Sequence, residues 1–264
     1  MLLAGLVIVF TVALGLAAYG LNRVVNPPPV SASGQCPAPP TGHPAPTATH
    51  TYPQAPPMTI QRGASYTALM CTNRGLIRVS LRTADAPKTV NAFVFLVNNG
   101  YYDGLTFHRV CPSTADKSCG SSTGSHVIRI AQGGDPKGDG TGRFPGFTIP
   151  DETPNGLYIA GTIALARPAN PDGSKVPDSS GGQFFINTGD NGFAPDYNLF
   201  GDVTAGLSVA RRLVTGDRVL WMAIQTNAVT TPSPASGAAS PGASPLPAAT
   251  GSASPAAPSP SPSP

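Results

Sequence analysis

Residues 89–110 read TVNAFVFLVNNGYYDGLTFHRV, and this stretch decides the fold class. Its first half predicts an amphipathic helix, because apolar side chains recur at helical spacing. The residues of this apolar face are Val90, Phe93, Val94 and Val97. Asp85 is a candidate N-cap, and Pro87 is tolerated in a first helical turn. Asn99 and Gly100 are typical of a helix end.

The second half of the stretch predicts a strand over Thr106–Val110 that contains Arg109. A guanidinium is unexpected in a strand otherwise suited to burial. Two further predicted strands carry an amide at one end, Gln132 before two glycines and Gln183 after two. Each of these residues alone is more often a satisfied buried polar group. Three of them at strand ends together indicate a functional site.

Short strands separated by glycine-rich turns are predicted within this stretch and on both sides of it. They are predicted at Tyr66–Cys71, Leu76–Leu81, Thr106–Val110, His126–Gln132, Thr162–Ala166, Gln183–Asn187, Leu199–Val203 and Val219–Gln225. A second helix is predicted over Ala205–Thr215. Many short strands with two helices favour a mostly β fold, namely a barrel whose ends the helices cover.

Composition divides the chain into an apolar segment at 1–22, a proline-rich linker at 23–57, one folded domain at 58–230 and a tail at 231–264. The linker and the tail contain 21 of the 31 prolines and few large apolar residues. They cannot bury enough surface to offset the entropy of ordering. We therefore expect a semi-rigid linker and a disordered Pro/Ser/Ala-rich tail.

Met1–Leu21 has no charged side chain and is long enough to cross a bilayer as a helix. No basic residue precedes it, and it is longer than a usual signal-peptide core, which favours a retained anchor. A cleaved signal is the alternative, since Gly15, Ala17 and Ala18 could support cleavage. Arg23, which follows the apolar segment, is the one residue that would favour a cytoplasmic position for the chain after this segment. We expect a membrane-anchored protein with an extracytoplasmic domain, or one secreted after cleavage.

The membrane segment argues for an oxidising compartment, where disulfides form. Cys111 and Cys119 bracket the polar segment PSTADKS, so we expect a disulfide between them. The pairing of Cys36 and Cys71 stays open. The sequence contains no C-x-x-C pair and no histidine at zinc-finger spacing, so its cysteines do not indicate a metal site. A net charge of +3 without a dense Lys/Arg run argues against a nucleic-acid binder.

Five segments in series resemble a known family. They are TVNAFVFLVNNGYYDGLTFHRV, AQGGDPKGDGTG, GTIALAR, SSGGQFFIN and YNLFGDV. Their order and spacing are similar to those of cyclophilin-type peptidyl-prolyl cis-trans isomerases, over Tyr66 to Ile224. The apolar and proline-rich segments resemble membrane-anchored or exported bacterial members. The resemblance implies a closed eight-stranded antiparallel barrel capped by two α-helices, and no cofactor.

The resemblance also implies roles for individual residues. The arginine of FHR falls on Arg109 and the glutamine of QGG on Gln132, and both would be catalytic. The proline pocket and its peptide groove would include His108, Ile130, Ala166, Arg167, Gln183, Phe185, Phe193 and Tyr197. The implied activity is rotation about X–Pro bonds in exported or surface proteins, which assists their folding. The implied partners are proline-containing peptides and folding proteins, and we expect a monomer.

One departure from the family pattern leaves other functions open. An insertion, Cys111–Ser125, stands where a short turn usually supplies an aromatic wall, and the aligned position falls on Arg129. Strand alternation places Ile128, Ile130 and Gln132 on one face, so we expect Arg129 to point away. The alternatives are a catalytically weakened proline-peptide binding module of the cell envelope, and a structural protein whose tail is the working part.

Overall fold

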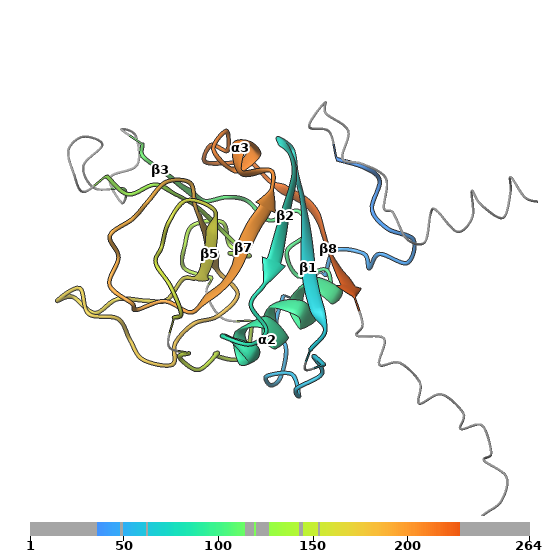
Figure 1. Cartoon of the computed structure of the whole chain (residues 1–264), viewed down its shortest axis with the longest axis horizontal. Coiled ribbons are helices and arrows are strands. Elements are labelled where there is room, and N and C mark those ends of the chain that lie inside the picture. Colours follow the sequence, from blue (N-terminus) through green and yellow to red (C-terminus); the bar gives the residue numbers. More distant parts are fainter. Residues whose placement is uncertain are drawn as a thin grey trace, which may run out of the picture. The chain divides into compact units, whose positions relative to one another are not determined.

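The computed structural model describes residues 36–47, 50–61, 63–113, 119, 127–142, 145–152 and 154–227. These residues form an eight-stranded antiparallel sheet and two helices (Figure 1). The elements are β1 (Ser65–Thr72), β2 (Gly75–Leu81), α2 (Pro87–Asn98), β3 (Arg109–Cys111), β4 (Ile130–Gly133), β5 (Thr162–Leu165), β6 (Phe184–Asn187), β7 (Leu199–Ala205), α3 (Leu207–Ala210) and β8 (Val219–Asn227). The strand order is β3-β4-β6-β5-β7-β2-β1-β8.

The prediction of a mostly β fold with eight antiparallel strands and two helices is confirmed, but the closed barrel is wrong. The sheet is open and curled, with β3 and β8 as its edges. The edges approach each other at an isolated bridge between Thr106 and Arg218. The predicted strand at Thr106–Val110 enters the sheet only at Arg109. The residues before it make backbone hydrogen bonds with Asp217 and Val219, but these do not continue as a ladder along β8.

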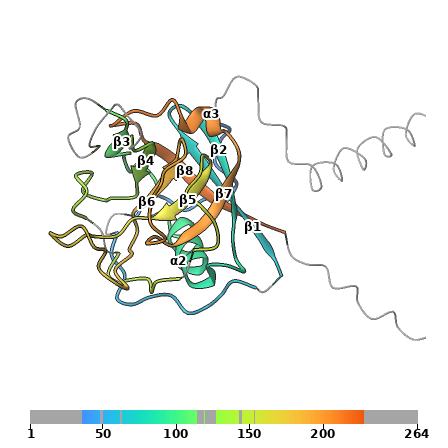
Figure 2. The same ribbon diagram turned by 60° about the vertical axis from the view of Figure 1, so that its left-hand side comes forward.

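The core lies inside the curl of the sheet, where α2 packs its apolar face. Val90, Phe93, Val94 and Val97 are all buried, as predicted. The ring of Phe93 lies 4.9 Å from Phe200 of β7 and 6.3 Å from Phe184 of β6, centroid to centroid. Figure 2 shows α2 and α3 at opposite ends of the curled sheet. This aromatic packing fixes β6, whose next residue, Phe185, points to the other side.

The beginning of α2 differs from the prediction in its cap. Pro87 lies in the first turn as predicted, but the N-cap is Ala86, which has no capping side chain. The Asp85 carboxylate instead accepts a hydrogen bond from Asn155. Glu152 accepts hydrogen bonds from the backbone N–H groups of Lys88 (2.9 Å) and Thr89 (2.8 Å). A carboxylate distant in sequence thus satisfies the orphan donors and complements the helix dipole.

The second helix, Leu207–Ala210, is much shorter than the predicted Ala205–Thr215, and it begins later because strand pairing takes the first predicted residue. β7 extends to Ala205, which is opposite Arg78 of β2. Gly206 follows with a φ of 87°, and a Cβ there would lie 2.3 Å from the Leu76 carbonyl oxygen. A left-handed glycine in close backbone contact separates strand from helix, so the helix begins at Leu207.

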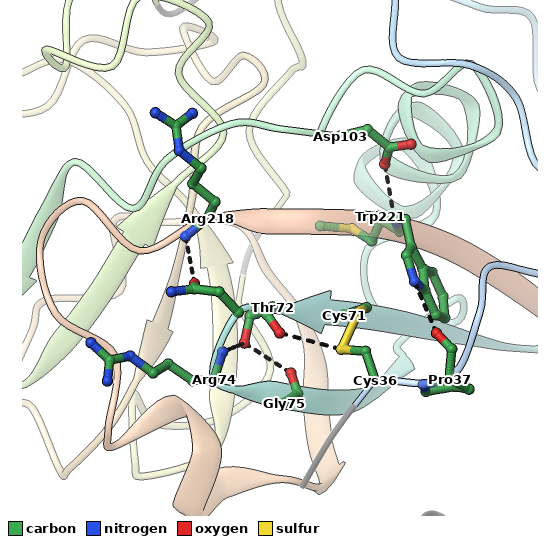
Figure 3. The surroundings of a disulfide bond; sticks show 11 residues. Cys36, Pro37, Cys71, Thr72, Arg74, Gly75, Asp103, Arg218 and Trp221 are labelled. Atoms are coloured by element: carbon green, nitrogen blue, oxygen red, sulfur yellow. Dashed lines mark hydrogen bonds between the residues drawn. A yellow bond between two sulfur atoms is a disulfide. The ribbon is translucent and has the colours of Figure 1, made fainter.

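The described residues at the end of the predicted linker, 36–47 and 50–57, lie against the domain. A disulfide joins Cys36 to Cys71 of β1, with Cα atoms 5.5 Å apart (Figure 3). The indole Nε1 of Trp221 donates a 3.3 Å hydrogen bond to the Pro37 carbonyl. These contacts fasten the segment across the β1–β8 pair.

Met1–Leu21, the first part of the linker, His126 and the tail at 231–264 lie outside the described residues. In the part of the chain that the structure describes, no helix is both long enough and apolar enough to cross a bilayer. The membrane anchor therefore stays a prediction.

Candidate active site

A cavity of about 400 Å³ lies over strands β3, β4 and β6. Its described lining residues are Arg109, Ile128, Ile130, Gln132, Ala166, Arg167, Ala169, Lys175, Phe185, Phe193 and Tyr197. The structure brings together here every predicted site residue except His108 and Gln183. Ile128, Ala169 and Lys175 are additional lining residues.

Arg109 and Gln132 meet because β3 and β4 pair in antiparallel register. The two residues are directly opposite each other, and Arg109 Nη1 donates a 3.2 Å hydrogen bond to Gln132 Oε1. Both side chains are half-buried in the cavity wall. The bond orients the guanidinium, whose planar fork carries five N–H donors.

Gln183 lies behind Gln132 rather than in the cavity wall. Gln132 Nε2 donates a 3.0 Å hydrogen bond to Gln183 Oε1, and Gln183 Nε2 donates a 3.1 Å bond to the Gly140 carbonyl. Gln183 is buried. A relay of amides therefore connects Arg109 to the loop that follows β4, and each amide in it is satisfied at both ends.

His108 also lies outside the cavity wall, on the side of that same loop. A Cβ on Gly140 would lie 3.6 Å from the His108 ring, so the ring packs against this glycine. The buried carboxylate of Asp135 holds the loop by accepting 3.0 Å hydrogen bonds from the N–H groups of Lys137 and Asp139. His108 and Asp135 thus support the loop whose Gly140 carbonyl accepts the hydrogen bond from Gln183.

Aromatic rings form the apolar wall of the cavity. The ring centroid of Phe185 lies 5.9 Å from Phe193 and 5.1 Å from Tyr197. Behind them, Tyr158 exchanges two 2.9 Å hydrogen bonds with the Tyr197 backbone. Burial raises the pKa of the Tyr158 hydroxyl, which therefore stays neutral and can both donate and accept. This wall suits a flat apolar ring.

Arg167 and Ala166 follow β5 directly and form another side of the cavity. The Arg167 guanidinium makes an ion pair with Asp151, and its side chain is only 8% exposed. The Arg167 stem and the small Ala166 side chain leave room beside the aromatic wall.

Arg129 points away from the cavity, as strand alternation predicted. It is exposed and does not line the cavity. Its backbone N–H donates a 2.8 Å hydrogen bond to Asn191, and its side chain lies over Gly189. Ile128, on the cavity side of the same strand extension, lines the wall instead.

The insertion after β3 begins next to the cavity. Cys111 and Cys119 form a disulfide, the pairing predicted from their spacing. Both are buried in one apolar cluster with Ile130 and Phe185. Residues 114–118 and 120–126 lie outside the described residues. The disulfide fixes the base of the insertion against the back of the aromatic wall.

Sequence reasoning missed Lys175, which no motif marks. It lies in the connection between β5 and β6, where neither helical nor strand periodicity indicates a direction. The signal that could have found it is the length of that connection, Ala166–Gln183, between two of the recognisable segments.

The chemical character of the cavity follows from these residues. Among the described lining residues none is a carboxylate, histidine, serine or cysteine. The cavity offers an apolar ring site and charged hydrogen-bond donors at its edge. Such a site can bind a small apolar ring and donate a hydrogen bond to an atom beside it.

Comparisons with known proteins agree with this geometry. A family model described as cyclophilin type peptidyl-prolyl cis-trans isomerase/CLD matches residues 67–229. A peptidyl-prolyl cis-trans isomerase of Synechococcus elongatus is 37% identical over 169 residues, 61% of this chain and 97% of the relative. A probable peptidyl-prolyl cis-trans isomerase B of Mycobacterium tuberculosis is 34% identical over 148 residues, 54% of this chain. The chain spans 44% of that relative's length.

Among solved structures, a cyclophilin type peptidyl-prolyl cis-trans isomerase of Cryptosporidium parvum is similar, at 22% identity and a TM-score of 0.49. The match covers 62% of this chain and 99% of that one.

Proposed function

The chain belongs to the cyclophilin-type peptidyl-prolyl cis-trans isomerases, and we propose that it accelerates rotation about X–Pro bonds at the cavity beside Arg109. The observation that carries this assignment is the Arg109–Gln132 pair at the edge of an aromatic cavity. The proline ring would lie against Phe185 and Phe193, and the residue before proline would lie along Ala166 and Arg167.

The reaction needs no bond to break. The barrier comes from amide resonance, about 18–20 kcal/mol, and uncatalysed X–Pro exchange takes tens of seconds or longer. In the twisted transition state the prolyl nitrogen becomes pyramidal, and its lone pair, which is delocalised into the carbonyl in the planar amide, becomes localised on the nitrogen. Arg109 can donate a hydrogen bond to that lone pair, which is unavailable in the planar amide. The site therefore stabilises the twisted state more than either planar state.

The remaining residues restrict motion. The aromatic wall holds the proline ring while the preceding carbonyl rotates. Gln132 holds the guanidinium through its 3.2 Å hydrogen bond, and Gln183 holds Gln132. Fixed placement of the donor avoids reorganisation during the reaction, which is the usual source of such catalysis.

Exchange NMR on an Ala-Pro peptide tests the activity of the purified protein. We expect the protein to make cis/trans exchange of this peptide visible within seconds. An otherwise identical Ala-Ala peptide is the control for binding that does not depend on proline. Shift changes of the proline peptide without faster exchange would instead support the proline-peptide binding module.

We further propose that the substrates are exported or surface proteins, whose folding the isomerase assists. The apolar N-terminal segment motivates this setting, and two disulfides in the described residues suit an oxidising compartment. Cell fractionation with mass spectrometry of the N-terminus tests it. An intact N-terminus in the membrane fraction supports an anchor, and a shortened one in the medium supports secretion. Recovery in the cytosol would contradict both.

A further inference from the structure

The charged side chains among the described lining residues of the cavity are all cationic. Its three charged residues are Arg109, Arg167 and Lys175. Asp151 forms an ion pair with Arg167 and so offsets that charge. Arg109 donates a hydrogen bond to the neutral side chain of Gln132. Lys175, the third cation, is in no ion pair between the described residues.

Lys175 is placed at the cavity by a small hairpin in the β5–β6 connection. Ala169 and Lys175 form an isolated antiparallel bridge. Within it, the Asn170 N–H donates a 2.8 Å hydrogen bond to the Ser174 carbonyl. The Asp172 carboxylate closes the turn by accepting hydrogen bonds from the backbone and side chain of Ser174. The hairpin holds both Ala169 and Lys175 in the cavity wall.

The Lys175 ammonium lies over the aromatic wall rather than beside a carboxylate. Its Nζ is 5.5 Å from the centroid of the Tyr197 ring, and it donates a long 3.4 Å hydrogen bond to the Gly173 carbonyl. None of the ion pairs between described residues includes it. A cation–π contact holds an ammonium at the mouth of an apolar site without neutralising it.

We propose that Lys175 makes this isomerase select X–Pro substrates that carry a carboxylate side chain on a residue next to the proline. The proposal rests on the proposed function, since it concerns the same cavity. A peptide whose proline ring lies against Phe185 and Phe193 passes Tyr197, and so brings its neighbouring side chains within reach of the ammonium. A carboxylate there meets a cation that no ion pair between the described residues offsets, whereas a lysine would meet like charge.

The expected size of the preference is modest, because the cavity mouth is open to water. Two opposite charges about 5 Å apart, at a dielectric constant close to that of water, favour binding by roughly five- to tenfold over a neutral isostere. Salt should weaken the preference, since the screening length falls to about 3 Å at 1 M.

The test compares kcat/KM for matched peptides that differ only in charge. One pair has Glu or Gln before the proline, a second pair has Glu or Gln after it, and a Lys-Pro peptide completes the set. For wild type we expect a Glu/Gln ratio of roughly five to ten in at least one pair, reduced at high salt. Lys175→Gln should bring that ratio close to one, and Lys175→Glu should favour the Lys-Pro peptide.

Lys88→Gln is the matched control, because it removes one positive charge on α2, outside this cavity. It should keep the wild-type ratio. A wild-type ratio near one in both pairs, or a ratio that Lys175→Gln leaves unchanged, would overturn the proposal. Catalysis of the Gln peptides reports the isomerase itself, so failure of the charge preference and failure of the proposed function are distinguishable.

Discussion

Arg109 and Gln132 are cross-strand partners in the β3–β4 pair, joined by a 3.2 Å hydrogen bond from Nη1 to Oε1. The Gln132 amide cannot rotate freely, because its nitrogen donates to Gln183, which in turn donates to the Gly140 carbonyl. The position of the guanidinium therefore depends on a chain of amides that reaches beyond the cavity.

Gln132→Ala should lower kcat/KM for an Ala-Pro peptide by roughly tenfold, mainly through kcat, because the guanidinium loses its orientation. Gln225→Ala is a matched control, since Arg78 donates a hydrogen bond of the same length to Gln225 between β2 and β8. We expect the control to keep wild-type kinetics. Equal losses in the two variants would show that positioning of Arg109 is not what Gln132 supplies.

Phe193→Ala should raise KM for proline peptides by about tenfold, because the half-buried ring forms part of the apolar wall. The expected loss in unfolding free energy is about 1–2 kcal/mol, less than for a fully buried phenylalanine. Phe95→Ala removes another half-buried ring, which lies on α2 with its centroid 4.9 Å from that of Tyr52. The Phe95→Ala variant should lose a similar amount of unfolding free energy, and its KM should stay unchanged. A KM that rises equally in both variants would contradict the placement of proline on this wall.

Removing the Cys36–Cys71 disulfide should cost more stability than removing Cys111–Cys119. The bonds join residues 35 and 8 positions apart, and loop closure predicts losses of about 4 and about 2.5 kcal/mol. Denaturant unfolding of the two double Cys→Ser variants measures this difference. In the Cys36→Ser/Cys71→Ser variant, the segment that begins at Cys36 loses its covalent link to β1 and keeps the hydrogen bond from Trp221 to the Pro37 carbonyl. The opposite order of stabilities would show that 36–57 contributes little to the domain.

Asp217 should make the protein less stable at acidic pH. Burial opposes its ionisation, but hydrogen bonds from Arg74, Asn73 and the Val214 N–H outweigh burial and lower its pKa. A lowered carboxyl pKa contributes stability that is present above the unfolded value, near 4, and is lost as pH falls through the folded value. Asp217→Asn should therefore be less stable than wild type at neutral pH, with a smaller difference near pH 2. Thermal melting of both proteins from about pH 6 to 2 measures this difference in stability. A difference that stays constant over this pH range would refute the prediction.

The sequence predicted best where one side-chain pattern determined one element. The apolar positions of α2 recur on one face and face the core, and Arg109 and Gln132 stand in short motifs whose order is recognisable. Strand alternation placed Arg129 outside the cavity, because a single residue step along a strand reverses the side.

The sequence predicted least where distant segments compete. Glu152, rather than the adjacent Asp85, satisfies the first N–H groups of α2, and pairing with Arg78 takes Ala205 into β7. Closure of the barrel was wrong because the contact between the two edges of the sheet is a single bridge, Thr106 with Arg218, that does not extend into a ladder. Lys175 lies on a hairpin that no periodicity marks, so only its position in space reveals its relation to Tyr197.

The most direct test of the central claim is exchange NMR of an Ala-Pro peptide with Arg109→Ala, beside Arg109→Lys. Removing a donor that acts on the transition state should slow catalysed exchange by roughly 100- to 1,000-fold. The lysine variant should recover little, because it lacks the planar fork. Both variants should keep a wild-type circular dichroism spectrum and still bind the peptide. Wild-type exchange by Arg109→Ala would contradict the assignment of this residue and of the mechanism that depends on it.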